Sequence, residues 1–376
     1  MTPKIARFLT EANPATPCLV VDLDVIADNF KRLKAALPLA QIYYAVKANP
    51  ALEILRVLDR LGSSFDTASI YEIEDCLKLG IGPERLSFGS TIKKEEHIRR
   101  AFAAGVRLYA FDSGAELEKL SRAAPGARVF CRIFMTGEGA DWPLSRKFGC
   151  SIEMAKDLLI RARDLGLDPH GVSFHVGSQQ RDLTQWDIAL GKTKMLFTAL
   201  NAAGIELKLI NMGGGFPARY RQRIPSVDAY AGAIMEAMTA HFGNNLPQMI
   251  VEPGRGIAGD AGVIQAEVVL ISSKGEDDNR RWVYLDIGKF GGLPETMDEA
   301  IQYRIQTPHD GKPVGPVVLA GPTCDEMDML YEKAGYTLPL DLAVGDKVQI
   351  LSAGAYTTTY ASVGFNGFPP LQAYYI

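Results

Sequence analysis

Short apolar runs alternate with amphipathic stretches over most of the chain, from about residue 40 to about residue 255. The amphipathic stretches have the spacing of helices, and many stop at a glycine, as helix C-termini commonly do. Strands that alternate with helices are typical of a parallel sheet. Eight apolar runs occur, at residues 42–48, 64–68, 86–90, 108–112, 129–134, 172–176, 207–212 and 249–252. The pattern therefore predicts an α/β fold, either a (β/α)8 barrel or a doubly wound sheet.

Polar residues fall at or just beyond the ends of these runs. A barrel enzyme gathers its chemistry at the C-terminal ends of its strands, so this placement favours a (β/α)8 barrel over residues 36–260. The residues concerned are Lys47, Asp66, Ser90, Asp112, Arg132, His175, the glycines 213–215 and Glu252.

The pattern changes after residue 260 to alternating strands without clear helices, at residues 263–272, 282–286, 317–320 and 348–352. Such alternation predicts a half-exposed antiparallel sheet. We expect a second, C-terminal all-β domain over residues 261–376. The first 35 residues hold another strand-like run, 18–22, and are expected to join this β domain.

The composition of the chain argues against several functional classes of protein. Apolar residues make up 47% of the chain and charged residues 22%, which is ordinary for a globular protein. The net charge of −4 lacks the basic footprint of a nucleic-acid binder. Neither a signal peptide nor a membrane-spanning run is recognisable. The charge run at residues 93–96 is expected to be a solvated face without a function.

The five cysteines are an odd number, and none are paired at C-x-x-C spacing. The sequence therefore predicts neither a disulfide framework nor a zinc site, and no metal is expected. A reducing cytoplasm fits this use of cysteine best. Cys324 alone lies outside strand-like surroundings.

Lys47 ends the apolar run that begins at Ile42. An ammonium group there is partly desolvated, which eases its deprotonation. A lysine that forms a Schiff base with a cofactor needs that setting. The alternative is a lysine that merely emerges into solvent at a strand end.

Three further groups suggest a phosphorylated aromatic cofactor. The glycines 213–215 can cradle a phosphate with their backbone N–H groups, or can form a simple tight turn. Glu252 can pair with a pyridine nitrogen and Arg255 with a phosphate, unless the two form a local salt bridge. His175, within an apolar strand, can stack on a planar ring or be a structural histidine.

Together with the Cys324–Asp325 turn, these residues make the chain resemble the ornithine/lysine/diaminopimelate/arginine decarboxylase family, which has an alanine-racemase-like fold. The resemblance covers nearly the whole chain and is strongest to the ornithine and lysine decarboxylases. Seven motifs carry it in order, at residues 44–49, 65–69, 175–178, 213–216, 252–255, 321–325 and 354–357.

The resemblance implies pyridoxal 5'-phosphate as the cofactor, bound covalently to Lys47, with His175 stacked on the ring and Glu252 at its nitrogen. Cys324 would protonate the substrate carbon after CO2 loss, and Asp325 would bind the distal ammonium. These last two residues would come from the partner subunit of a homodimer with shared active sites. The phosphate would be held by Ser178, Gly213, Gly214, Gly215, Arg255 and Tyr356, with Asp66 and Arg132 as supporting polar groups.

The expected reaction is decarboxylation of L-ornithine to putrescine in polyamine biosynthesis. Glu252 favours decarboxylation over racemisation, because related racemases place an arginine near the ring nitrogen. Asp325 favours a diamine end over the distal carboxylate of diaminopimelate. Glu295 and Asp298 are further candidates for substrate binding. Lysine or dual lysine/ornithine decarboxylation remains an alternative, followed by diaminopimelate decarboxylation and a non-catalytic regulatory homologue.

Overall fold

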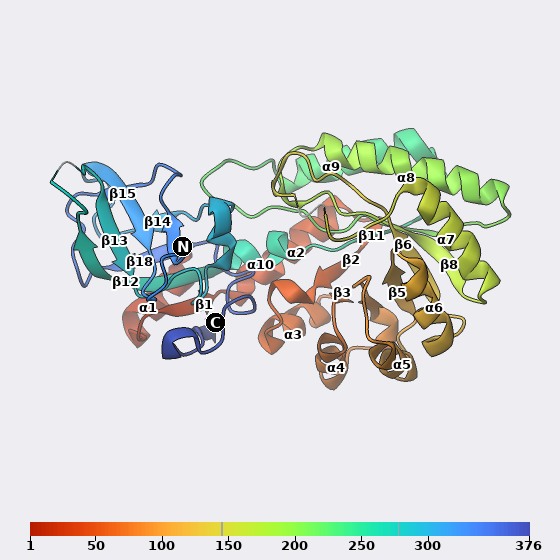
Figure 1. Cartoon of the computed structure of the whole chain (residues 1–376), viewed down its shortest axis with the longest axis horizontal. Helices are drawn as coiled ribbons and strands as arrows, with labels where there is room; N and C mark the ends of the chain where they lie inside the picture. The colour runs from red at the N-terminus through yellow and green to blue at the C-terminus, as the bar shows by residue number, and fades with distance from the viewer. Residues whose placement is uncertain (144–145, 277) are drawn as a thin grey trace. The chain divides into compact units, whose positions relative to one another are not determined.

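The computed structural model describes residues 1–143, 146–276 and 278–376 (Figure 1). The chain forms two compact units. The barrel unit comprises Ala27–Pro217 and Ile224–Gly256, and the β unit comprises Met1–Ile26, Ala218–Arg223 and Ile257–Ile376. None of the helices in the described ranges is long and apolar enough to cross a membrane.

The barrel unit confirms the predicted (β/α)8 architecture. In the described part of the chain, eight parallel strands close into a barrel in the order β10-β11-β2-β3-β4-β5-β6-β8. Their inward side chains form a packed core of Tyr43, Leu108, Ala110, Phe130, Leu209 and Ile250. The strands are β2 (Ala40–Ala45), β3 (Ser64–Thr67), β4 (Leu86–Phe88), β5 (Leu108–Phe111), β6 (Arg128–Arg132), β8 (Asp168–Ser173), β10 (Leu209–Asn211) and β11 (Gln248–Val251).

Several of these strands end earlier than the apolar runs predicted. The run at 42–48, for example, leaves the sheet after Ala45 and continues as the 3-10 turn η1 (Val46–Ala48). Apolar residues continue past the strand because the mouth of the barrel is also buried. The polar side chains consequently lie mostly in the turns that follow the strands.

Helices surround the barrel, and serine hydroxyls cap several of them. Each of these serines accepts a hydrogen bond from the backbone N–H three residues later in the chain, a group that would otherwise be unpaired at the start of a helix. The serines are Ser69, Ser113, Ser151 and Ser226. The helices are α2 (Leu23–Ala36), α3 (Leu52–Arg60), α4 (Ile70–Lys78), α5 (Glu95–Ala103), α6 (Gly114–Ala123), α7 (Ile152–Asp164), α8 (Thr184–Ala202) and α9 (Val227–Phe242). Strands β7 (Ala140–Trp142) and β9 (Ser178–Gln180) pair in a separate two-stranded antiparallel sheet.

Within its described residues, the β unit contains a nine-stranded sheet. The expectation of a purely antiparallel sheet is wrong: β13 pairs with β15, and β1 with β19, in parallel. The segment between β13 and β15 is long enough to bring the chain back in the same direction. The strands are β1 (Cys18–Val21), β12 (Gly262–Ser272), β13 (Arg281–Leu285), β14 (Ile305–Gln306), β15 (Val314–Ala320), β16 (Met329–Tyr331), β17 (Thr337–Pro339), β18 (Lys347–Leu351) and β19 (Gln372–Tyr375).

Helical segments complete this unit. Helix α1 (Pro3–Ala12) packs its apolar face, Ile5 and Leu9, on strands β1, β12 and β18. The N-terminal strand β1 pairs with β12 and β19, so the first residues belong to the β unit. The short segments are η3 (Gly259–Ala261), η4 (Pro294–Glu299), η5 (Phe365–Gly367) and α10 (Arg255–Ala258), the first two residues of which belong to the barrel unit.

All five cysteines are free thiols. Four are buried, and Cys324 is exposed. The sulfur atoms of Cys131 and Cys150 nevertheless lie 3.6 Å apart, because Cys150 bridges to the end of β6. Sequence spacing gives no hint of this contact, since it depends on how the chain returns to the barrel.

Candidate active site

Lys47 and Asp66 form an ion pair at the mouth of the barrel. Lys47 lies in η1, directly after β2, and its Nζ is 3.1 Å from Oδ2 of Asp66 on β3. Ser87 on β4 donates a hydrogen bond to the other carboxylate oxygen at 3.1 Å. The Asp66 side chain is 4% exposed, whereas that of Lys47 is 48% exposed. The amine is thus held by a fixed carboxylate and still open to a ligand.

Glu252 follows β11 and has an unusual protonation equilibrium. Burial raises the pKa of its carboxyl to about 7, and the nearby Asp66 charge adds to this effect, whereas the Lys47 cation opposes it. Asn211, at the end of β10, donates a hydrogen bond from Nδ2 to Glu252 Oε1. A carboxyl group poised in this way gains its charge readily when a cation is placed beside it.

His175 lies just past β8, where burial lowers the pKa of its imidazole to about 3, with a further contribution from Arg132. Its Nδ1 lies 3.3 Å from the backbone nitrogen of Gly214 and accepts a hydrogen bond from it. The acceptor role places the ring proton on Nε2. The imidazole is therefore neutral and held in one orientation, as stacking on a planar ring requires.

The backbone at residues 213–215 has no room for a side chain. Gly213 and Gly215 have φ of +64° and +100°. A Cβ on Gly213 would lie 2.3 Å from the Phe174 carbonyl oxygen, and one on Gly215 would lie 2.7 Å from that of Gly177. The turn therefore brings bare backbone close to the strand ends, as a phosphate cradle does.

Arg255 supplies a cation to this region. It is 3% exposed, and its Nη2 and Nε lie 3.0 and 3.3 Å from Ser178 Oγ, to which they donate. A guanidinium group buried next to a hydroxyl and a glycine turn suits a phosphate dianion. Together with the neutral ring of His175 and the carboxyl of Glu252, this donor set fits pyridoxal 5'-phosphate.

Arg132, the last residue of β6, joins the same cluster. Its guanidinium carbon lies 5.1 Å from the centre of the Phe148 ring. Burial lowers the pKa of Arg132, while the charges of Glu252, Asp112 and Asp66 counteract this effect. The structure thus brings Lys47, Asp66, Arg132, His175, Ser178, the glycine run, Glu252 and Arg255 to one end of the barrel.

Glu72, in the first turn of α4, was not predicted from the sequence, and its carboxylate binds the backbone just before the N-cap residue Ser69. Glu72 N donates to Ser69 Oγ at 3.2 Å, and Ala68 N donates to Glu72 Oε2 at 2.6 Å. Burial raises the pKa of Glu72, and the Lys47 cation opposes this shift. The Ser-x-x-Glu spacing is a readable capping box and is the signal that could have found it.

The other predicted site residues lie on the β unit. Cys324 follows β15 with its side chain exposed, and its backbone nitrogen donates to Asn366 Oδ1 at 2.8 Å. The buried carboxylate of Asp328 accepts hydrogen bonds from Thr323 N, Thr323 Oγ1 and Lys289 N at 3.1, 2.7 and 2.7 Å. The Cys324 turn is therefore fixed at its backbone while the thiol stays accessible.

The remaining candidates differ in exposure. Glu295 is 5% exposed and lies inside η4, whereas Asp298 is exposed at a left-handed turn with φ of +51°. Asp325 is partly exposed, and Tyr356 also has a positive φ, of +57°. Of the two predicted candidates, Glu295 is buried and Asp298 is exposed to solvent.

Comparison with known proteins places the chain in a family. Residues 23–259 match the pyridoxal binding domain of the pyridoxal-dependent decarboxylases. The chain is 35% identical to a lysine/ornithine decarboxylase of Selenomonas ruminantium, over 98% of this chain and 91% of that protein. It is 33% identical to antizyme inhibitor 2 of Xenopus laevis, over 99% and 83% of the two chains.

A solved structure agrees with this assignment. Lysine/ornithine decarboxylase from Vibrio vulnificus, complexed with cadaverine, matches with a TM-score of 0.87 and 30% identity, covering 99% of this chain and 97% of that one. The chain therefore belongs to the pyridoxal-dependent decarboxylase family and is an amino-acid decarboxylase that uses pyridoxal 5'-phosphate.

Proposed function

We propose that this decarboxylase converts L-ornithine to putrescine. The observation that carries the proposal is the Cys324–Asp325 turn, in which an exposed thiol adjoins a carboxylate on a rigid backbone. A thiol can donate a proton, and a carboxylate can bind the distal ammonium of a basic amino acid. The names of the relatives, lysine/ornithine decarboxylases, support the same substrate class.

The barrel residues would hold the cofactor and control its charge. Lys47 would hold pyridoxal phosphate covalently through its Nζ. Bound pyridoxal phosphate supplies a protonated ring that takes up the electrons left by CO2. Glu252 keeps the proton on the ring nitrogen, since its carboxyl, with a pKa of about 7, ionises beside that cation. Neutral His175 packs on the ring.

The phosphate and the substrate would be held by separate groups. Arg255, Ser178 and the glycines 213–215 bind the phosphate, with Tyr356 as a further donor. Arg132 and Asp66 support the ring and Lys47. Cys324 Sγ delivers a proton to the substrate α-carbon, and Asp325 binds the distal ammonium. Asp298 is a better candidate than Glu295 for a second carboxylate that binds the substrate, because Asp298 is exposed and Glu295 is buried.

The proposal includes a homodimer in which Cys324 and Asp325 complete the site of the partner subunit. This arrangement would make each active site depend on both chains. The proposal is supported by the seven motifs, which resemble those of a family whose active sites are shared between two subunits.

Measurement of kcat/KM for L-ornithine, L-lysine, L-arginine and meso-diaminopimelate tests the substrate. We expect ornithine to be the best substrate and lysine to be roughly 10- to 200-fold poorer, because one methylene in a pocket is worth about 1–3 kcal/mol. Preference for arginine or diaminopimelate would contradict the proposal. Absence of turnover with cofactor bound would favour a regulatory role, for which the similarity to antizyme inhibitor 2 is the precedent.

A further inference from the structure

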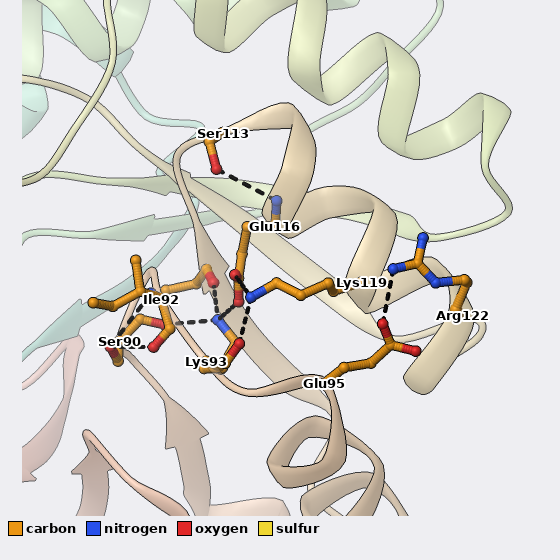
Figure 2. Close-up of polar contacts among 9 residues, drawn as sticks. Ser90, Ile92, Lys93, Glu95, Ser113, Glu116, Lys119 and Arg122 are labelled. Carbon is orange, nitrogen blue, oxygen red and sulfur yellow. Dashed lines mark hydrogen bonds and ion pairs between the residues drawn. The ribbon is translucent and has the colours of Figure 1, made fainter.

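Lys93 is buried at the mouth of the barrel (Figure 2). The expectation that the 93–96 charge run is solvated is therefore wrong for this residue. Its side chain is 0% exposed, and Nζ lies 2.9 Å from Glu116 Oε1. The same ammonium donates to the carbonyl oxygens of Ser90 and Ala110, each at 2.7 Å. Three acceptors from three segments thus surround one cation.

The position of these acceptors explains why a lysine is needed. Strands β4 and β5 pair only as far as Phe88 and Tyr109, after which β4 ends. The carbonyl of Ala110 lies one residue further along β5. It accepts a hydrogen bond from the Lys93 ammonium instead of from the backbone of a neighbouring strand. Because the ammonium also binds the Ser90 carbonyl, it ties the loop after β4 to β5.

Glu116 makes this tie rigid. It belongs to α6, and its second carboxylate oxygen lies 2.5 Å from Lys119 Nζ. Lys119 in turn donates to the backbone carbonyl of Lys93, so the three residues form a ring of contacts that closes on the Lys93 backbone (Figure 2). Burial lowers the pKa of Lys93 to about 8, while the Glu116 carboxylate favours the charged form.

The loop that Lys93 holds packs directly on Asp66. Gly89 N donates to the Thr67 carbonyl at 2.9 Å. A Cβ on Gly89 would lie only 1.9 Å from Asp66 Oδ1, so the backbone touches the carboxylate that pairs with Lys47. Displacement of the Gly89–Ser90 backbone would open this carboxylate to water and to other orientations.

We propose that Lys93, through Glu116, is a positioning residue that holds the Gly89–Ser90 backbone on Asp66 and so keeps Asp66 directed at Lys47. The inference rests on the proposed role of Lys47 as the cofactor lysine. The competing explanation is a buried ion pair that serves only global stability. Replacing a buried ion pair with apolar side chains is often neutral or stabilising, so stability and positioning can be separated.

Three variants separate a positioning role of Lys93 from a role in global stability alone. Lys93→Met removes the charge, and Lys93→Met/Glu116→Leu replaces the whole pair with apolar side chains. Arg85→Met is the matched control: Arg85 pairs with Asp59 at 2.6 Å and donates to the Ser63 carbonyl at 3.1 Å, at the opposite end of β4. For each protein we would measure the dissociation constant of pyridoxal phosphate, the melting temperature, and amide hydrogen exchange at Gly89 without cofactor.

Both Lys93 variants are expected to bind pyridoxal phosphate at least about fivefold more weakly, because the Ser90 and Ala110 carbonyls lose their partner. Gly89 should exchange faster in both, even though the double variant regains the melting temperature. Arg85→Met should lower the melting temperature and leave cofactor affinity within about twofold.

Recovery of cofactor affinity in the double variant would overturn the inference, as would an equal loss of affinity in Arg85→Met. If pyridoxal phosphate attaches to wild-type protein at a lysine other than 47, the proposed function fails instead. The exchange rate of Gly89 still decides whether Lys93 holds the loop, since that measurement needs no cofactor.

Discussion

Asn211 donates a hydrogen bond from Nδ2 to Glu252 Oε1, and through Oδ1 it accepts the backbone N–H of Gly213 at 3.0 Å. One side chain therefore connects the carboxyl group proposed for the ring nitrogen with the first glycine of the proposed phosphate turn. This contact fixes Glu252 before any cofactor binds. Preorganisation of this kind is what lets a single charge act strongly on a reaction.

Glu252→Gln should slow decarboxylation by about 100-fold or more, because a neutral amide cannot keep the ring nitrogen protonated. Cofactor affinity should change little, since Arg255, Ser178 and Lys47 remain. Single-turnover CO2 release measures the chemical step directly. Near-normal kcat in this variant would rule out the proposed role of the carboxylate.

The Glu252 contribution to the stability of the cofactor-free protein should fall as pH rises from about 4.5 to about 7, whereas His175, whose pKa folding lowers to about 3, contributes in the opposite direction below about pH 6.5. Folding raises the pKa of Glu252 to about 7, so the folded state binds more protons than the unfolded state in this window. The Glu252 contribution is on the order of 2 kcal/mol. Urea unfolding of wild type and Glu252→Gln at pH 5 and pH 7.5 checks it. Because the His175 contribution is common to both proteins, the change in stability between the two pH values should be less favourable for wild type than for the variant; identical changes would argue against the shifted pKa of Glu252.

Cys324→Ala should misdirect protonation after CO2 leaves. With the thiol absent, we expect part of the turnover to yield an aldehyde and the amine form of the cofactor in place of putrescine. Chromatography of the products, compared with the CO2 released, measures how much of the turnover gives aldehyde and how much gives putrescine. Clean putrescine formation at the wild-type rate would exclude Cys324 as the proton donor.

A shared site predicts complementation between two inactive variants. Lys47→Ala and Cys324→Ala, each nearly inactive, would be mixed and allowed to exchange subunits. About half of the dimers become mixed, and each of these has one intact site, so activity should return to roughly a quarter of wild type. Lack of recovery, with exchange verified by tagged subunits, would mean that each chain completes its own site.

Much of the barrel could be predicted because local patterns agree with the tertiary fold. Apolar runs and glycine helix stops mark the alternation of strands and helices, and the polar residue after each run marks the mouth of the barrel. Lys47, His175 and Glu252 were identifiable for this reason: each lies one or two residues past the end of a strand. The chain order alone brings such residues to the same end.

Contacts that depend on distant segments could not be predicted. Lys93 looks solvated in a charge run, because its partner Glu116 lies on helix α6, more than 20 residues further along the chain, and its other partners are the backbone carbonyls of Ser90 and Ala110. The parallel pairing of β13 with β15 depends on the path of the connecting segment and leaves no periodic signature. Asn211 was missed because an asparagine at a strand end has many possible uses.

The most direct test of the account is borohydride reduction of the purified holoprotein, followed by peptide mapping. Lys47 is half-exposed and paired with Asp66, whereas Lys93, at the same end of the barrel, is fully enclosed. We expect one pyridoxyl group per chain, on the peptide that contains Lys47, and none after Lys47→Ala. A pyridoxyl group on Lys93 or any other lysine would contradict it.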